Sequence, residues 1–166
     1  MLKFSTDHSA ADLSAPTVII TAGLPAAGKS SLCEHLWPEL PTLDCDELKK
    51  DHPDFDPKRP ELVHAWSAAE FDKRRVVALG SGVTHILDST ATNIEKVAGW
   101  VAEAHGAGFR VHLLMVTCTT ATSIARNAAR ERTVPVHIIE AKSKIVRESF
   151  AALTAIADSS ETIDNN

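Results

Sequence analysis

The segment that most restricts the fold of this chain is the octapeptide GLPAAGKS at positions 23–30. It matches the pattern G-x-x-x-x-G-K-[ST], and it lies between a β-branched run, TVIITA, and a segment that repeats Leu32 and Leu36 at helical spacing. Glycines at both ends let the backbone curl so that its N–H groups point inward, and the following helix adds its positive end. The octapeptide therefore predicts a strand, a phosphate-binding loop and a helix, in that order.

The residues of this loop have expected parts in holding a nucleotide. Lys29 is placed to reach the outer phosphates, and the Ser30 hydroxyl can bind Mg²⁺. The residues expected to bind the nucleotide are Gly23, Ala26, Ala27, Gly28, Lys29, Ser30 and Ser31. An accidental glycine-rich turn is the alternative, and the strand and helix on either side argue against it.

Strand and helix patterns alternate along the rest of the chain. Apolar runs predict strands at 17–22, 41–45, 83–88 and 110–116, and helical periodicity predicts helices at 30–37, 61–79, 93–108, 120–132 and 136–153. The alternation predicts an α/β fold of the P-loop NTPase type, with a parallel sheet of about four or five strands and helices on both faces. Ligands of such sheets bind at the carboxyl ends of the strands.

Length and composition fit one enzyme-sized domain. The 166 residues allow one domain, which we expect at 17–157, with an N-terminal extension at 1–16 and a frayed polar tail at 158–166. No apolar stretch approaches the roughly 20 residues that span a bilayer, and the amino terminus lacks a secretory signal, so we expect a cytoplasmic protein with no membrane partner. A net charge of -5 argues against indiscriminate coating of nucleic acid but leaves a local basic site open.

Two acids stand where strands are expected to end. Asp46 follows the second strand in LDCDELKK, where a carboxylate can accept a proton from a hydroxyl, although Asp44 and Glu47 are alternatives and a helix N-terminal acid is the structural explanation. Asp88 ends the run HIL in the manner of a Walker B acid, which orders Mg²⁺ through its water shell; a turn cap is the alternative.

Basic residues cluster in two places. Arg126, Arg130 and Arg132 lie on overlapping faces of the predicted helix at 120–132, so they can converge on one anion or pair with neighbouring glutamates on a solvated face. Lys49 and the basic residues that follow it, Lys50, Lys58 and Arg59, surround the proline-rich loop at 49–60 and serve either as a substrate clamp or as solubilising charges.

Together these motifs resemble the zeta-toxin and polynucleotide-kinase group of small P-loop kinases, over about residues 17–150. The segments that carry the resemblance are GLPAAGKSS, LDCDELKKDHPDFD, ILDSTATN and RNAARERTVPVHII. The resemblance implies that Asp46 is the general base, that Lys29 and Ser30 hold nucleotide and magnesium, and that Arg130, with Arg126 one turn earlier, is the arginine of a lid.

The resemblance also implies an acceptor site. Lys49 stands where polynucleotide kinases place an arginine that holds the nucleic acid phosphate, and Thr90 follows the strand that ends at Asp88. We expect ATP or GTP with Mg²⁺, and transfer of the γ-phosphoryl group to a nucleic acid hydroxyl, either a 5′ end or a hydroxymethylated base. A nucleotide sugar such as UDP-N-acetylglucosamine is the second acceptor class, and a nucleotide-dependent switch is the non-kinase alternative. The sequence identifies no protein partner.

Overall fold

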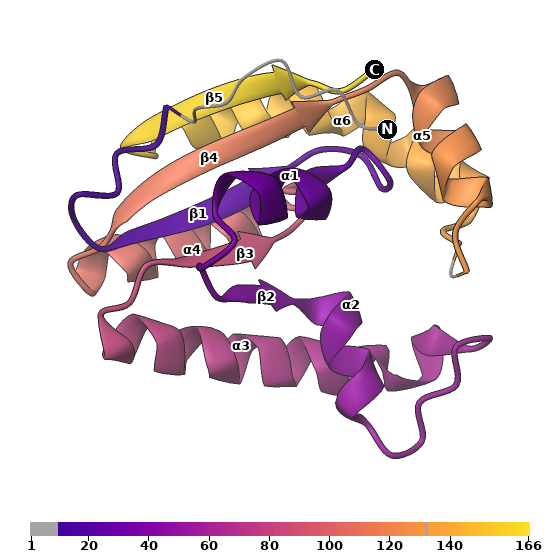
Figure 1. Ribbon diagram of the computed structural model, residues 1–166, viewed down its shortest axis with the longest axis horizontal. Coiled ribbons are helices and arrows are strands. Elements are labelled where there is room, and N and C mark those ends of the chain that lie inside the picture. The colour runs from indigo at the N-terminus through magenta and orange to yellow at the C-terminus, as the bar shows by residue number, and fades with distance from the viewer. Residues whose placement is uncertain (1–9, 132) are drawn as a thin grey trace.

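The computed structural model describes residues 10–131 and 133–166, and it contains a five-stranded sheet in the order β2-β3-β1-β4-β5 (Figure 1). All the strand pairs are parallel. The strands are β1 (Thr17–Ala22), β2 (Thr42–Asp44), β3 (His85–Asp88), β4 (Arg110–Thr117) and β5 (Ser159–Asp164). The predicted parallel α/β sheet is therefore confirmed.

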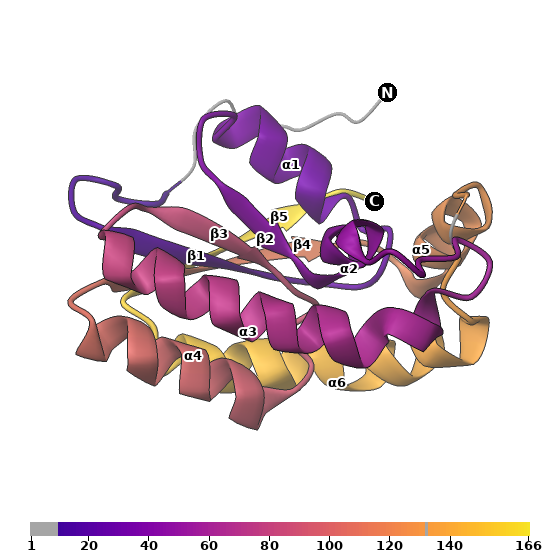
Figure 2. The same cartoon turned by 90° about the horizontal axis from the view of Figure 1, so that it is seen from below.

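Helices cover both faces of the sheet. They are α1 (Lys29–Leu36), α2 (Cys45–Leu48), α3 (His64–Ser81), α4 (Ile94–Gly106), α5 (Thr120–Ala128) and α6 (Val136–Thr154), with short 3-10 helices η1 (Lys49–Asp51) and η2 (Pro60–Val63). Figures 1 and 2 show α1 on one face and α4 and α6 on the other, while α3 runs beside the β2 edge. The Phe71 and Trp100 rings, 5.3 Å apart, join α3 to α4.

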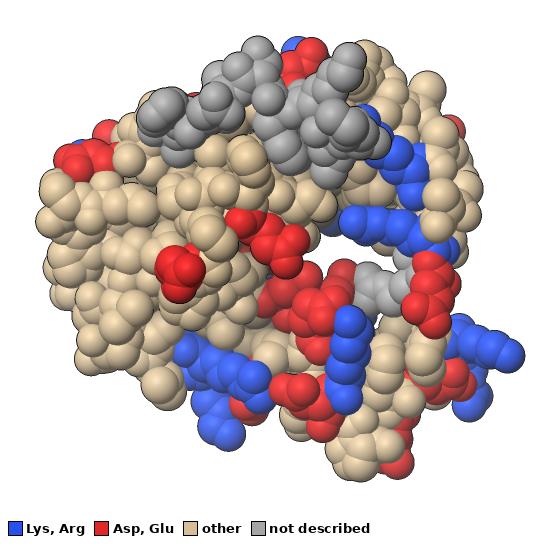
Figure 3. Space-filling view, in the orientation of Figure 1, with Lys and Arg blue, Asp and Glu red and all other residues tan. Residues whose placement is uncertain are grey.

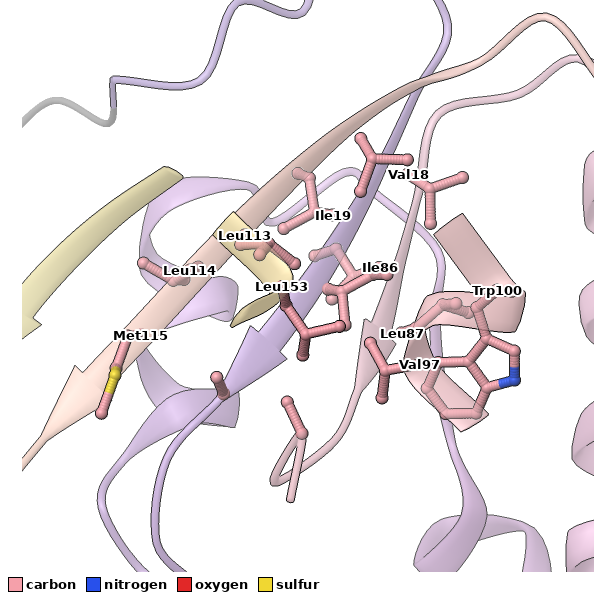
Figure 4. Packing of buried hydrophobic residues seen from close by; sticks show 14 of the residues in the cluster. Val18, Ile19, Ile86, Leu87, Val97, Trp100, Leu113, Leu114, Met115 and Leu153 are labelled. Atoms are coloured by element: carbon pink, nitrogen blue, oxygen red, sulfur yellow. The ribbon is translucent and has the colours of Figure 1, made fainter. Parts of the chain in front are cut away.

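The hydrophobic core lies between β1, its two neighbouring strands and the helices behind them (Figure 4). Every residue of β1 is buried, which explains why its sequence is a continuous β-branched run rather than an alternating one. Trp100 from α4 and Leu153 from α6 complete the core beneath the strands. A rigid, fully buried β1 gives the loop that follows it a fixed starting point.

The C-terminal segment corrects one expectation. Residues 158–166 were expected to form a frayed tail, but Ser159–Asp164 form β5, which pairs in parallel with His112–Thr117 of β4. The segment SSETID contains a single large apolar residue, Ile163, because an edge strand needs little apolar surface. Its pairing with β4, the contacts of Ser159 and Glu161 with the buried His112, and the packing of Ile163 against the core hold it in the sheet.

The structure also differs from the expected bounds of one helix and adds a contact in the expected N-terminal extension. The helix expected at 120–132 ends at Ala128, so Arg130 lies beyond α5; Arg132 is outside the described residues. In the expected N-terminal extension, the first nine residues are also outside them, and Asp12 forms an ion pair with Arg110 of β4 at 2.6 Å. None of the helices in the described part of the chain combines the length and apolar character needed to span a bilayer.

Candidate active site

A cavity of about 480 Å³ opens where β1, β2 and β3 end. Its walls come from the phosphate loop, from the turn between β2 and α2, from the segment after β3, and from residues of α3, α4 and α6. Figure 3 shows a hollow on this side of the molecule with acidic side chains along one border and basic side chains on the opposite border. A cavity with both charge signs at the ends of parallel strands is the position expected for a ligand site.

The phosphate loop has the backbone that its glycines were expected to allow. Gly23 has a φ of +138°, and a Cβ at this position would stand 2.4 Å from the Val116 carbonyl oxygen, so only glycine fits. Gly28 is left-handed with a φ of +95° and precedes α1, and Ala26 is held at +56°. A left-handed alanine costs about 1–2 kcal/mol, which the surrounding contacts must offset.

Lys29 folds back over the loop. Its ammonium donates to the carbonyl oxygens of Gly23 at 3.4 Å and Leu24 at 3.1 Å. Burial lowers the pKa of Lys29, and the nearby Asp88 charge opposes that effect. Phosphate oxygens are stronger acceptors than these carbonyls, so the lysine is ready to exchange its partners for a bound polyphosphate.

Ser30 and Asp88, the two predicted magnesium residues, lie together. The Ser30 hydroxyl donates to Asp88 Oδ2 at 2.7 Å, and the Thr21 hydroxyl donates to Asp88 Oδ1 at 2.9 Å. The alternative role of Asp88 as a turn cap is filled by Ser89, whose hydroxyl accepts from the Ala91 N–H. Hydroxyl and carboxylate oxygens are the hard donors that Mg²⁺ prefers, so this pair fits the ion.

Asp44 and Asp46 both face the cavity but differ in surroundings. Asp44 caps α2, because its Oδ1 accepts from the Asp46 N–H at 2.7 Å. Burial, and then the charge of Asp88 beside it in the β2–β3 register, raises the pKa of Asp44 to about 6. Asp46 is exposed and forms an ion pair with Lys49 at 2.9 Å. Asp46 lies in the first turn of α2, the position of a helix N-terminal acid, and it also lines the cavity.

Lys49, expected to hold an acceptor phosphate, lies beside Asp46. It is 6% exposed, lies outside the cavity lining and forms an ion pair with Asp46. Its contact with an acceptor phosphate stays a prediction. Lys50 is paired with Glu47 at 2.6 Å. The helical turn of α2 places each lysine next to the acid three residues earlier. In an extended loop, residues three apart would not be neighbours.

The two arginines expected to act together are separated. Arg130 lines the cavity, but the Arg126 guanidinium donates to the main-chain oxygen of Asn165 at 2.7 Å and does not line it. Because α5 ends at Ala128, the two side chains do not share a helix face. Arg126 thus contacts the C-terminal segment instead of the ligand space.

Some of the residues expected to bind the nucleotide line the cavity and others do not. Ala26, Gly28, Lys29 and Ser30 line the cavity, whereas Ala27 is buried behind it. Gly23 borders a smaller cavity on the other side of the loop, and Ser31 is exposed on α1 outside both cavities. The structure therefore brings together the centre of the predicted loop but not its last serine.

Lys142 on α6 is a cavity residue that the sequence reasoning did not select. Its ammonium donates to the hydroxyls of Thr90 at 2.8 Å and Thr92 at 3.3 Å. Burial lowers its pKa, with the Lys29 charge adding to the effect. A signal was present: Lys142 falls in helical register with the buried Ile139 and Val146, and a lysine on a buried helix face calls for a function.

The far end of the cavity lies between α3 and α4. Its surface includes Phe71, Trp100 and Lys96, whose ammonium stands 5.4 Å from the centroid of the Trp100 ring. Thr90, expected to contact the acceptor, lines the cavity together with Thr92, and its main-chain oxygen accepts from the Gly23 N–H of the phosphate loop at 3.3 Å. The arrangement provides an apolar floor, hydroxyl groups and a cation within one pocket.

Comparisons with known proteins agree with this geometry. The zeta toxin family model matches residues 3–165, while no curated protein sequence matches the chain. A structure from the PezAT toxin-antitoxin system of Streptococcus pneumoniae is similar with a TM-score of 0.74 and 14% identity, covering 95% of this chain and 69% of that one.

Two further solved structures share the fold. A chain of the Pnkp1/Rnl/Hen1 RNA repair complex gives a TM-score of 0.65 at 12% identity, covering 89% of this chain and 47% of that one. A chain of the AvrRxo1-ORF1:AvrRxo1-ORF2 complex with ATP gives 0.58 at 17% identity, covering 84% and 47%. The chain thus spans about half the length of these two relatives, and identities this low establish the fold alone. With the family model matched across nearly its whole length, the chain belongs to the zeta-toxin family of P-loop kinases.

Proposed function

We propose that this protein binds ATP with Mg²⁺ and transfers the γ-phosphoryl group to a hydroxyl of a small acceptor molecule. One observation carries the proposal: Lys29 and Gly28 of the phosphate loop, the hydrogen-bonded Ser30–Asp88 pair and Asp46 all line one cavity. ATP is favoured over GTP because one structure of the same fold, the AvrRxo1 complex, contains ATP.

Charge neutralisation at the transferring group comes from three sources in this chain. The loop N–H groups and Lys29 would contact the β- and γ-phosphates of a bound nucleotide, and Arg130, which follows α5, also lines the cavity. Ser30 and Asp88 would hold Mg²⁺, which supplies positive charge to the phosphate oxygens when bound. Phosphoryl transfer gains most of its rate from such preorganised charge, so these residues are expected to affect kcat strongly.

Asp46 is the proposed base. The acceptor oxygen forms a bond to the γ-phosphorus, the bond from the γ-phosphorus to the bridging oxygen breaks, and ADP leaves with that electron pair. The acceptor proton passes to the Asp46 carboxylate. Lys49 holds one Asp46 oxygen at 2.9 Å and so fixes the side chain for this task.

The surroundings of Asp46 favour the small-molecule acceptor among the classes expected from the sequence. A nucleic acid acceptor needs cations for its backbone, but Lys49 is buried against Asp46 and Lys50 is paired with Glu47. Acidic side chains also gather along the border of the hollow (Figure 3). The pocket between α3 and α4, with its Trp100 ring and Lys96, suits a compact anionic molecule such as a nucleotide sugar.

Labelled ATP and GTP offered with a panel of acceptors test the proposal. The panel contains UDP-N-acetylglucosamine, free nucleosides, 5′-hydroxyl DNA and RNA, and hydroxymethylated duplex DNA. We expect transfer to a small acceptor, lost in Lys29→Ala and reduced in Asp46→Asn. Transfer only to DNA or RNA would overturn the choice of acceptor. Nucleotide hydrolysis that no acceptor stimulates would favour a switch over a kinase.

A further inference from the structure

Two buried side chains hold carbonyl groups of the phosphate loop from behind. The Ser123 hydroxyl of α5 donates to the Pro25 oxygen at 2.7 Å. The Asn165 side-chain amide, directly after β5, donates to the Ala27 oxygen at 2.7 Å. Ser123 is 0% and Asn165 5% exposed. Neither residue lines the cavity, so neither touches the space where a ligand binds.

The planarity of the peptide bond gives these contacts a directional effect. In a trans peptide the carbonyl of one residue and the N–H of the next point in opposite directions. A carbonyl held on the protein side therefore turns the following N–H toward the opposite side. The N–H groups that follow Pro25 and Ala27 belong to Ala26 and Gly28, and both of these residues line the cavity.

We propose that Ser123 and Asn165 are positioning residues that aim the Ala26 and Gly28 N–H groups at the phosphates. The inference rests on the proposed function, since it takes the loop to bind a nucleotide. The loop backbone is left-handed at Ala26 and Gly28, a conformation that needs outside support before any ligand arrives. Anchoring the carbonyls in advance lowers the ordering cost of binding.

Asn165 is itself fixed on all sides. Its main-chain N–H donates to the Thr117 oxygen at 2.8 Å, and its main-chain oxygen accepts from Arg126 at 2.7 Å. Arg126 and Ser123 both belong to α5, the helix that leads to Arg130. Figure 1 shows β5 and α5 converging near the end of β1. Arg126 therefore supports the loop indirectly, through Asn165, instead of contacting the phosphate as expected from the sequence.

Asn166 offers a matched control in the neighbouring position. Its side-chain oxygen accepts from the Thr119 N–H at 3.1 Å and from the Thr122 hydroxyl at 2.8 Å, so it holds α5 but not the loop. Asn165→Ala and Ser123→Ala remove a loop contact each, and Asn165→Asp replaces the donor by an acceptor of the same shape. Asn166→Ala removes two exposed hydrogen bonds to the start of α5 and leaves the loop contacts in place.

The experiment measures binding of the Mg²⁺ complex of a non-hydrolysable ATP analogue by titration calorimetry, with full-length variants. Losing one hydrogen bond of this kind is expected to raise Kd about tenfold in Asn165→Ala and in Ser123→Ala, and more in Asn165→Asp. Asn166→Ala should stay within about twofold of the unmodified protein. Melting curves without nucleotide establish the temperature at which every variant is folded.

Hydrogen exchange of the free proteins separates positioning from mere stability. Faster exchange at the Ala27 amide, which donates to the Leu24 oxygen at 3.2 Å within the loop, is the expected result in Asn165→Ala, with unchanged exchange in β1. If Kd and loop exchange stay unchanged in both Asn165→Ala and Ser123→Ala while Lys29→Ala abolishes binding, the positioning role is wrong and the proposed function stands. If the unmodified protein binds no nucleotide, the proposed function itself fails.

Discussion

Replacing Asp44 by asparagine should stabilise the free protein at neutral pH and leave its stability unchanged in acid. Burial and the charge of Asp88 raise the pKa of Asp44 from 3.8 to about 6 in the folded state. Because each pKa unit is worth about 1.4 kcal/mol, the folded protein carries this charge at a cost of about 3 kcal/mol at pH 7.5. Asparagine keeps the shape and the oxygen that caps the Asp46 N–H.

The pH dependence follows from the direction of the pKa shift. Below pH 3.8 the Asp44 carboxyl is protonated in both the folded and the unfolded state, so its charge costs nothing. As the pH rises from 3.8 through about 6, the unfolded chain releases the proton first, and the folded state loses stability relative to it. The gain from Asp44→Asn should therefore be near zero at about pH 4 and reach about 2–3 kcal/mol at about pH 7.5.

Urea unfolding of both proteins at several pH values, in a chelator that removes divalent ions, measures this difference directly. Asp56→Asn is the matched control with the opposite sign, because the Lys58 N–H and Arg59 lower the pKa of Asp56. The ionised Asp56 carboxylate stabilises the folded state above the pKa of the unfolded chain, and this stabilisation disappears in acid. Asp56→Asn should therefore lose stability at neutral pH. An Asp44→Asn gain that is equal at every pH, or a loss at neutral pH, would refute the reasoning.

The remaining predictions concern the reaction and the loop. Asp46→Asn should lower kcat by about 10² or more with little change in nucleotide affinity, measured by acceptor phosphorylation; if Asp44→Asn is the more damaging change, the base is assigned to the wrong acid. Arg130→Lys should lower kcat at least about tenfold, because an ammonium cannot span two phosphate oxygens; an unchanged kcat would remove this arginine from the transition state. Gly23→Ala should lower the free energy of unfolding in urea by about 2 kcal/mol or more, because its Cβ would clash with the Val116 oxygen. Gly99→Ala on the open face of α4 should raise the free energy of unfolding by about 0.5–1 kcal/mol. Equal effects of the two substitutions would show that the loop tolerates a side chain.

Local sequence was enough to predict the strand, the loop and the helix at the start of the fold. The β-branched run at 17–22, the glycines at 23 and 28 and the helix that follows depend on backbone preferences and burial over a few residues. The same holds for the parallel order of strands and helices, because alternating elements leave few other ways to bury their apolar faces. The positions of Asp46 and Asp88 at the cavity were also predictable, since Asp88 ends β3 and Asp46 lies two residues after the end of β2.

The partners of the charged side chains depended on tertiary structure. Lys49 meets Asp46 because α2 forms a short turn, Arg126 meets Asn165 because β5 joins the sheet, and Lys142 reaches Thr90 across the packing of α6. The Arg126 and Lys142 contacts join groups whose partner is chosen by where separate elements pack, whereas the Lys49–Asp46 pair, three residues apart, needs only the local turn of α2. The C-terminal strand shows the same limit, because its Ser159 and Glu161 side chains bond to the buried His112 of β4, a partner that only the packed sheet brings within reach.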